Sequence, residues 1–95
     1  MSTTFEVTGY CPCKKCCNKD DGITASGVKA KANHTIAAQK SIYPFGTKIQ
    51  LDGYGTFVVE DVGGAIKGNR IDRFFNTHQE ALNWGRKKCT GRVVQ

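Results

Sequence analysis

Hydrophobic and polar residues alternate along several short stretches of the chain, and a repeat of two residues is typical of strands with one buried face. In residues 3–10, Phe5 and Val7 fall on one side of the predicted strand, and Thr4 and Glu6 fall on the other. Further strands are predicted over residues 35–38, 48–51, 56–62, 70–75 and 91–94. About six short strands favour a mainly β fold that closes into a small barrel, because closure removes exposed sheet edges.

One segment has the pattern of a helix. Thr77 and Glu80 have the spacing of a capping box, in which each side chain satisfies a free backbone N–H of the other residue. Leu82 and Trp84 follow as part of an apolar face, and Gly85 ends or weakens the pattern. We therefore expect one short helix that begins near Thr77 and packs Leu82 and Trp84 against the barrel.

The chain has 95 residues, which suffice for one domain, so residues 1–95 are predicted to fold as a single unit. Hydrophobic residues make up 39% and charged residues 23%, which is the balance of a folded globular domain. No apolar run approaches the roughly 20 residues of a membrane span, and the first residues do not predict a signal peptide. The net charge of +6 attracts polyanions, so nucleic acid, an anionic cell wall and acidic lipid are all compatible partners on charge alone.

Five cysteines are a high count for this length. Four of them lie close together, and Cys89 lies far away along the chain; the four are Cys11, Cys13, Cys16 and Cys17. The pair Cys13 and Cys16 has the spacing of half a zinc site, but no matching second pair follows. Disulfides are the alternative that we favour, and reduced, packed thiols are the third. We expect the cysteines to be structural and to take no part in chemistry.

Two carboxylates, Asp61 and Asp72, bracket a loop that contains three glycines. Glycine permits close approach of the backbone to a ligand or to another strand. The loop lacks the Gly-Lys-Ser/Thr ending of a phosphate-binding loop. From the residues alone, the pair can be general acid and base, a site for a hard cation, or turn formers at strand ends.

The segment from Asp61 to Asp72 reads Asp-x-Gly-Gly-Ala-Ile-Lys-Gly-Asn-Arg-Ile-Asp, and it resembles the signature of the bacterial 3D domain. That family is named for three aspartates and is similar to the catalytic domain of MltA-type lytic transglycosylases. Residues 10–17, 22–27, 42–47 and 78–85 match further motifs of the family, so the resemblance extends over nearly the whole chain.

The resemblance implies a double-psi β-barrel, peptidoglycan glycan strands as substrate, and a lytic transglycosylase reaction. On this chain, Asp72 matches the catalytic aspartate and Asp61 the supporting one. The first family aspartate is replaced by Gln39, which can form hydrogen bonds but carries no charge. The departure keeps a second hypothesis open, that of a wall-glycan binding module without turnover, and a nucleic-acid binder is a third.

Other residues within the matched motifs are candidates for substrate binding. Thr24 and Ser26 can donate hydrogen bonds to sugar hydroxyls, and Tyr10 can stack on a sugar; the remaining candidates are Gln39, Gly63, Gly64 and Lys67. We expect no cofactor and no catalytic metal. The expected partner is peptidoglycan, with no nucleic acid and no membrane span, and the expected state is a monomer in an extracytoplasmic cell-wall location.

Overall fold

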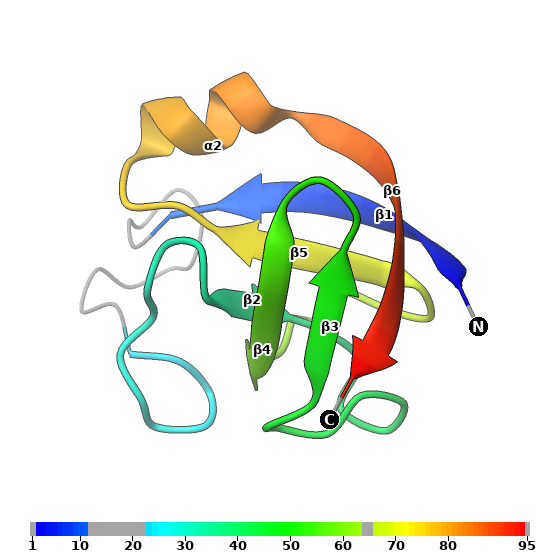
Figure 1. Cartoon of the computed structure of the whole chain (residues 1–95). Coiled ribbons are helices and arrows are strands. Elements are labelled where there is room, and N and C mark those ends of the chain that lie inside the picture. Colours follow the sequence, from blue (N-terminus) through cyan, green and yellow to red (C-terminus); the bar gives the residue numbers. More distant parts are fainter. Residues whose placement is uncertain (1, 12–22, 64–65, 95) are drawn as a thin grey trace.

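The structure is a computed structural model that describes residues 2–11, 23–63 and 66–94. Its strands are β1 (Thr3–Tyr10), β2 (Thr35–Ala37), β3 (Lys48–Leu51), β4 (Gly55–Asp61), β5 (Arg70–Phe74) and β6 (Arg86–Val94), and its helix is α2 (His78–Trp84). The strands form one closed barrel, and α2 lies beside β1 (Figure 1). The predicted mainly β, six-stranded barrel with one short helix is confirmed within the described residues.

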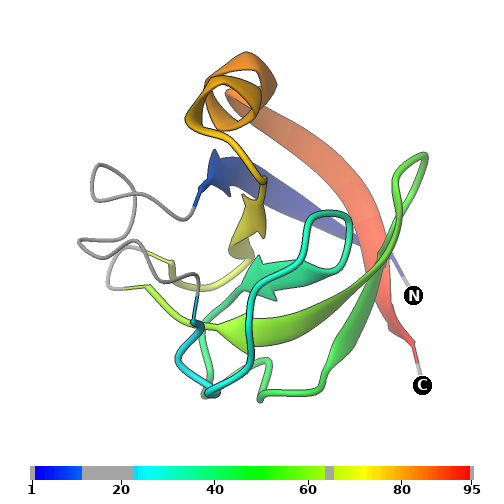
Figure 2. The ribbon, with the colours of Figure 1, turned by 90° about the vertical axis from the view of Figure 1, so that its left-hand side faces the viewer.

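The order of strands around the barrel is β1-β5-β2-β4-β3-β6. Two neighbouring pairs are parallel, β1 with β5 and β2 with β4, and each joins strands that are distant along the chain. The other pairs are antiparallel. Figure 2 shows the strands curving around a common interior. The two interlocked parallel pairs agree with the predicted double-psi arrangement, and they bring the two halves of the chain together on one wall of the barrel.

The barrel interior is filled by aliphatic and aromatic side chains from every strand. Alternation along β1 turns Phe5 and Val7 inward, as predicted, and leaves Thr8 and Tyr10 on the outer face. The core contains Phe5, Val7, Ile36, Ala38, Ile49, Leu51, Phe57, Val59, Ile71 and Cys89. A second, smaller apolar cluster lies on the outer face, where Tyr10, Ala37 and Phe74 pack together. This outer cluster borders the candidate site described below.

Helix α2 begins and ends as its sequence predicts. The Thr77 hydroxyl accepts a hydrogen bond from the Glu80 backbone N–H at 3.2 Å, and Gly85 ends the helix at a φ of 65°. Trp84 packs against the core and donates from its indole nitrogen to the Val7 carbonyl at 3.0 Å. No helix within the described residues is long and apolar enough to cross a membrane.

The predicted packing of Leu82 is wrong, because its side chain is 60% exposed. The inward face of α2 is formed instead by Ala81 and Trp84, which are three residues apart and therefore on the same side of a helix. Leu82 lies about 100° away around the helix axis, where it faces solvent.

Strand β6 begins at Arg86, five residues before the predicted start. It pairs first with β1 and then, from Gly91, with β3. Its first three side chains, Arg86, Lys87 and Lys88, are exposed, so this part of the strand has no apolar alternation. Backbone hydrogen bonds to β1 hold it in place.

Gly91 lies where the two ladders of β6 meet, and the packing there leaves no room for a side chain. A Cβ atom would lie 2.5 Å from the Gln50 carbonyl oxygen and 2.9 Å from a Leu51 methyl group. Gly91→Ala should therefore lower the free energy of unfolding by about 2 kcal/mol or more, measured by urea unfolding. Thr90→Ala, at an exposed neighbouring position, is the control and should change it by less than about 0.5 kcal/mol. Equal stabilities of the two variants would contradict this packing.

Candidate active site

The register of the barrel places Asp61 and Asp72 in one row across four strands. Asp61 of β4 pairs with Ala37 of β2, Ala37 pairs with Asp72 of β5, and Asp72 pairs with Thr8 of β1. The small Ala37 thus separates the two carboxylates, which are two strand spacings apart, or about 10 Å between backbones. The structure therefore brings together the two residues that the sequence singled out.

A bulge in β4 turns Asp61 to the outer face. Strict alternation from Val59, which points into the core, would also direct Asp61 into the core. The register between β2 and β4 shifts between Ile36 and Ala37, so that Glu60 is the extra residue and Asp61 pairs with Ala37. A bulge of this kind re-aims the side chains that follow it.

Asp72 lies in a largely buried position on the outer face of β5. The Thr8 hydroxyl donates to Asp72 Oδ1 at 3.0 Å and also contacts the Ile71 carbonyl at 3.3 Å. Burial raises the pKa of Asp72 from 3.8 to about 6, against the lowering effects of the Thr8 hydrogen bond and the Arg70 charge; the Asp61 charge raises it slightly further. A carboxyl group of this kind can hold and release a proton near neutral pH.

Asp61 accepts three hydrogen bonds. Its Oδ1 accepts from the backbone N–H groups of Ala25 and Val62, both at 2.9 Å, and its Oδ2 accepts from the Tyr10 hydroxyl at 3.2 Å. The carboxylate therefore fastens the loop around Ala25 to the end of β4. We expected Asp61 to tune Asp72, and its charge acts in that direction, but burial is the larger cause of the raised pKa.

Tyr10 is 7% exposed, so its ring is not available to stack on a sugar as we predicted. The ring packs edge-on against Phe74 at 5.4 Å between centroids, and Ala30 and Ala32 pack against the same cluster. The loop that carries these alanines covers the outer face of β1 at this point. The role of Tyr10 in the structure is to hold Asp61 through its hydroxyl.

Thr24 and Ser26 belong to the loop that Asp61 fastens. Thr24 is only 4% exposed, and its hydroxyl donates to the Val28 carbonyl at 2.8 Å and lies 3.0 Å from the Ser26 hydroxyl. Thr24 therefore shapes the turn, and a direct contact with substrate is not favoured. Ser26 is partly exposed, and its backbone N–H donates to the Glu60 carbonyl at 3.1 Å. Of the two hydroxyls, that of Ser26 is the better placed for a substrate.

Gln39 connects the turn after β2 to the loop before β5. Its Oε1 accepts from the Gly68 backbone N–H at 2.7 Å, and its Nε2 donates to the Ser41 hydroxyl at 3.0 Å. Together with Gly63 and Lys67, it lines an open hollow of about 530 Å³. Gly63 is exposed and lies close to Ile66, and Gly64 falls outside the described residues.

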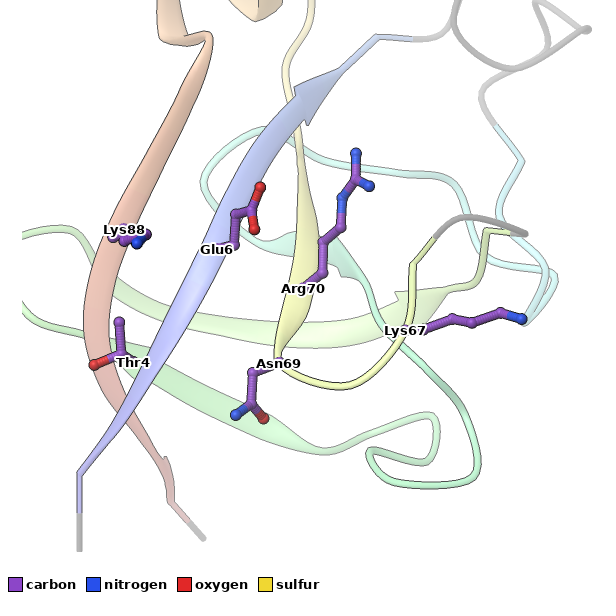
Figure 3. A pocket seen from close by; sticks show the side chains of 6 residues that line it. All are labelled: Thr4, Glu6, Lys67, Asn69, Arg70 and Lys88. Carbon is purple, nitrogen blue, oxygen red and sulfur yellow. The ribbon is translucent and has the colours of Figure 1, made fainter.

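A second hollow, of about 320 Å³, lies on the outer faces of β1, β5 and β6 (Figure 3). It is lined by Thr4, Glu6, Lys67, Asn69, Arg70 and Lys88. Lys67 lines both hollows, so they adjoin each other near the start of β5. Sequence reasoning missed Thr8 as a neighbour of Asp72, and it missed Glu6 and Lys88 as residues that line this hollow. The alternation of β1 could have shown that Glu6 and Thr8 share a face, whereas the pairing of β1 with β5 could not be inferred from the sequence.

The cysteines have different surroundings. Cys89 is a free thiol inside the core cluster, so the predicted structural disulfide or metal role is wrong for this residue. Its inward position on β6 makes it a small apolar filler. Cys11 is buried, with its sulfur 3.4 Å from His78 Nδ1, and Cys13, Cys16 and Cys17 fall outside the described residues. No cluster of three His, Cys, Asp or Glu side chains suited to a metal occurs within the described part of the chain.

Comparisons with known proteins point to cell-wall proteins. A sequence model of the 3D domain matches residues 34–95. The curated "Cell wall-binding protein YocH" of Bacillus subtilis (strain 168) is 40% identical over 76 residues, which are 77% of this chain and 26% of YocH.

Two solved structures share the fold. MltA from Escherichia coli, described as having a unique lytic transglycosylase fold, matches with a TM-score of 0.64 and 27% identity over 77% of this chain and 27% of MltA. The lytic transglycosylase LtgG of Burkholderia pseudomallei matches with a TM-score of 0.59 and 32% identity over 75% of this chain and 25% of LtgG. This chain thus spans about a quarter of the length of each of these proteins.

The burial of Asp72 predicts how folding stability depends on pH. A carboxyl group whose pKa rises from 3.8 to about 6 on folding contributes stability that is fully present below pH 3.8 and is lost as the pH rises through 6. The amide of an Asp72→Asn variant does not titrate. The free energy of unfolding of the wild type should therefore fall relative to that of the variant, by up to about 3 kcal/mol, as the pH rises from about 4 to 7.

Urea unfolding of both proteins at several pH values in this range measures the difference. All other titrating groups are common to the two proteins, so the change in the difference reports on Asp72. A difference that stays constant with pH would contradict the buried environment assigned to this carboxyl group.

Proposed function

Because the chain belongs to the 3D domain family, we propose that it is a lytic transglycosylase that cleaves the glycan strands of peptidoglycan. The observation that carries the proposal is the single carboxyl group of Asp72. Burial raises its pKa to about 6, and its side chain stays partly exposed on the outer face of the barrel. Arg70, two residues before Asp72 on β5, lines one of the two adjoining hollows, and their joint extent agrees with an extended polymer as ligand. The relatives named for cell-wall binding and lytic transglycosylase activity support a role at peptidoglycan and an extracytoplasmic location.

The proposed reaction uses Asp72 first as acid and then as base. Asp72 donates its proton to the bridging oxygen while the bond from that oxygen to C1 of the muramic acid breaks. The carboxylate that remains accepts the proton of the 6-hydroxyl of the same sugar, whose oxygen bonds to C1 and closes a 1,6-anhydro ring. Asp72 is thereby reprotonated and no water is consumed. An ordinary glycosidase needs a second carboxylate to activate water or form an ester, whereas here the sugar supplies its own nucleophile.

The neighbours of Asp72 have distinct proposed roles. The Thr8 hydroxyl fixes the orientation of one carboxyl oxygen through its 3.0 Å hydrogen bond. Asp61, two strands away, keeps the loop around Ala25 at the rim of the site and adds negative charge. That charge favours the protonated form of Asp72 and would also stabilise positive charge that develops on the sugar ring.

A second function, wall-glycan binding without turnover, has one observation in its favour. Gln39 replaces a family aspartate, and both ends of its amide are occupied by the Gly68 N–H and the Ser41 hydroxyl. An uncharged, hydrogen-bonded side chain shapes the loop but gives no electrostatic help to Asp72. The name of YocH, a cell wall-binding protein, agrees with this alternative.

Asp72→Asn should separate the two functions. The amide keeps the shape of the side chain but cannot transfer a proton, so we expect the release of anhydro-muropeptides from purified sacculi to fall about 10²–10⁴-fold. Mass spectrometry of the soluble products measures this release. Asp52→Asn, at an exposed residue of the turn between β3 and β4, is the control and should keep full activity. A wild type that binds sacculi in a pelleting assay without releasing such products would favour the binding module.

The same reaction predicts an acidic pH profile. The acid step requires protonated Asp72, so kcat/KM on soluble glycan strands should decrease as the pH rises above about 6. Activity that increases steadily from pH 5 to pH 8 would contradict Asp72 as the acid.

Gln39→Asp tests whether the missing aspartate limits turnover. If it does, restoring the negative charge should raise the rate of anhydro-muropeptide release at unchanged binding to sacculi. Gln39→Glu is the companion variant, because it keeps the chain length and the acceptor for the Gly68 N–H while it adds the charge. A lower rate in both variants, with folding retained, would show that the amide itself is required.

A further inference from the structure

The hollow on the outer faces of β1, β5 and β6 is rich in positive charge. Three cations line it, Lys67, Arg70 and Lys88, together with one carboxylate, Glu6. Glu6 is already engaged, because its Oε1 lies 2.9 Å from the Nε of Arg86. The hollow therefore has a surplus of cations whose charge no carboxylate within its lining balances.

Arg70 is the member of this set that is closest to the proposed chemistry. It precedes Asp72 by two residues on the same strand, so the two side chains leave β5 on the same face about 7 Å apart. In Figure 3 its side chain runs along β5, while Lys67 points away from the other labelled residues. Its Nε is buried without a hydrogen-bond partner, and no carboxylate of the described residues lies within 4.0 Å of its guanidinium group.

A buried, unpaired N–H of a guanidinium group is costly unless a ligand satisfies it. Arginine presents a planar fork that matches a carboxylate, and Asn69 and Thr4 add polar groups to the same lining. A cation-lined hollow of about 320 Å³ has room for one small acidic group and not for a second polymer.

We propose that this hollow binds a carboxylate of the glycan strand while the adjacent glycosidic bond lies at Asp72. The acidic group is a carboxylate of the muramoyl unit, either that of its lactyl ether or one on its stem peptide. The proposal rests on the proposed function, and it adds a charge requirement that a neutral glycan does not meet.

Binding of the carboxylate has a consequence for the acid. Arg70 lowers the pKa of Asp72 in the free protein. A carboxylate bound to Arg70 offsets that effect, so that a larger fraction of Asp72 is protonated when an acidic strand is bound than when the site is empty. The charge of the substrate thus favours the form of Asp72 that starts the reaction.

The test compares two forms of one ligand. Glycan strands stripped of stem peptides by an amidase carry one free lactyl carboxylate on each muramic acid. The same strands with these carboxylates blocked as methyl amides are neutral and otherwise alike. Affinities for both are measured by calorimetry on the full chain with Asp72→Asn, which prevents turnover, and strands that retain their peptides form a third arm.

The proposal predicts that the charged strand binds about 10-fold or more tightly than the blocked strand, and that Arg70→Gln removes most of this preference. Lys88→Gln, at an exposed lysine, should remove a smaller part. Arg92→Gln, at an exposed arginine paired with Asp52, is the matched control and should leave the preference intact. A preference seen only with peptide-bearing strands, and lost in Arg70→Gln, would assign the hollow to a stem-peptide carboxylate.

Equal affinities for charged, blocked and peptide-bearing strands would overturn the proposal, as would a preference that Arg70→Gln and Lys88→Gln both leave unchanged. If wild-type protein still released anhydro-muropeptides in that case, the proposed function would stand without this subsite. Absence of both glycan binding and products would refute the proposed function as well.

Discussion

The pairing of β2 with its two neighbours determines where both carboxylates lie. Ala37 pairs with Asp61 on one side and Asp72 on the other, and the bulge in β4 is needed to bring Asp61 to the same face. A shift of one residue in either ladder would direct one carboxylate into the core. The close packing of the barrel interior therefore also fixes the geometry of the site.

Around this row, the outer face has two chemically different sides. Tyr10, Phe74 and Ala37 form an apolar cluster on one side, and the hydroxyl of Tyr10 holds Asp61. Arg70 and Lys67 line the hollows on the other side. Burial of Asp72 raises its pKa, and the charge of Arg70 lowers it. The value of about 6 is the balance of these effects, so the charge of a bound ligand near Arg70 can shift it in either direction.

The sequence was informative where local chemistry decides the structure. The capping box predicted the start of α2 at Thr77, and alternation predicted β1 with its buried Phe5 and Val7. The sequence prediction failed where distant segments decide which side chains are buried. Ala81, and not Leu82, lies on the inner face of α2, and a loop covers Tyr10. The family resemblance identified Asp61 and Asp72, but the hydrogen bond of Thr8 to Asp72 depends on the parallel pairing of β1 with β5, which no local pattern reveals.

The proposed mechanism requires that Asp72, and not Asp61, meet the glycosidic oxygen. A crystal structure of the Asp72→Asn variant with a bound oligosaccharide that contains muramic acid tests it most directly. We expect the side chain at position 72 to lie within about 2.6–3.2 Å of one bridging oxygen, with the 6-hydroxyl of the muramic acid turned toward C1 of the same ring. A bridging oxygen that contacts Asp61 instead, or a glycan bound away from both positions, would contradict it.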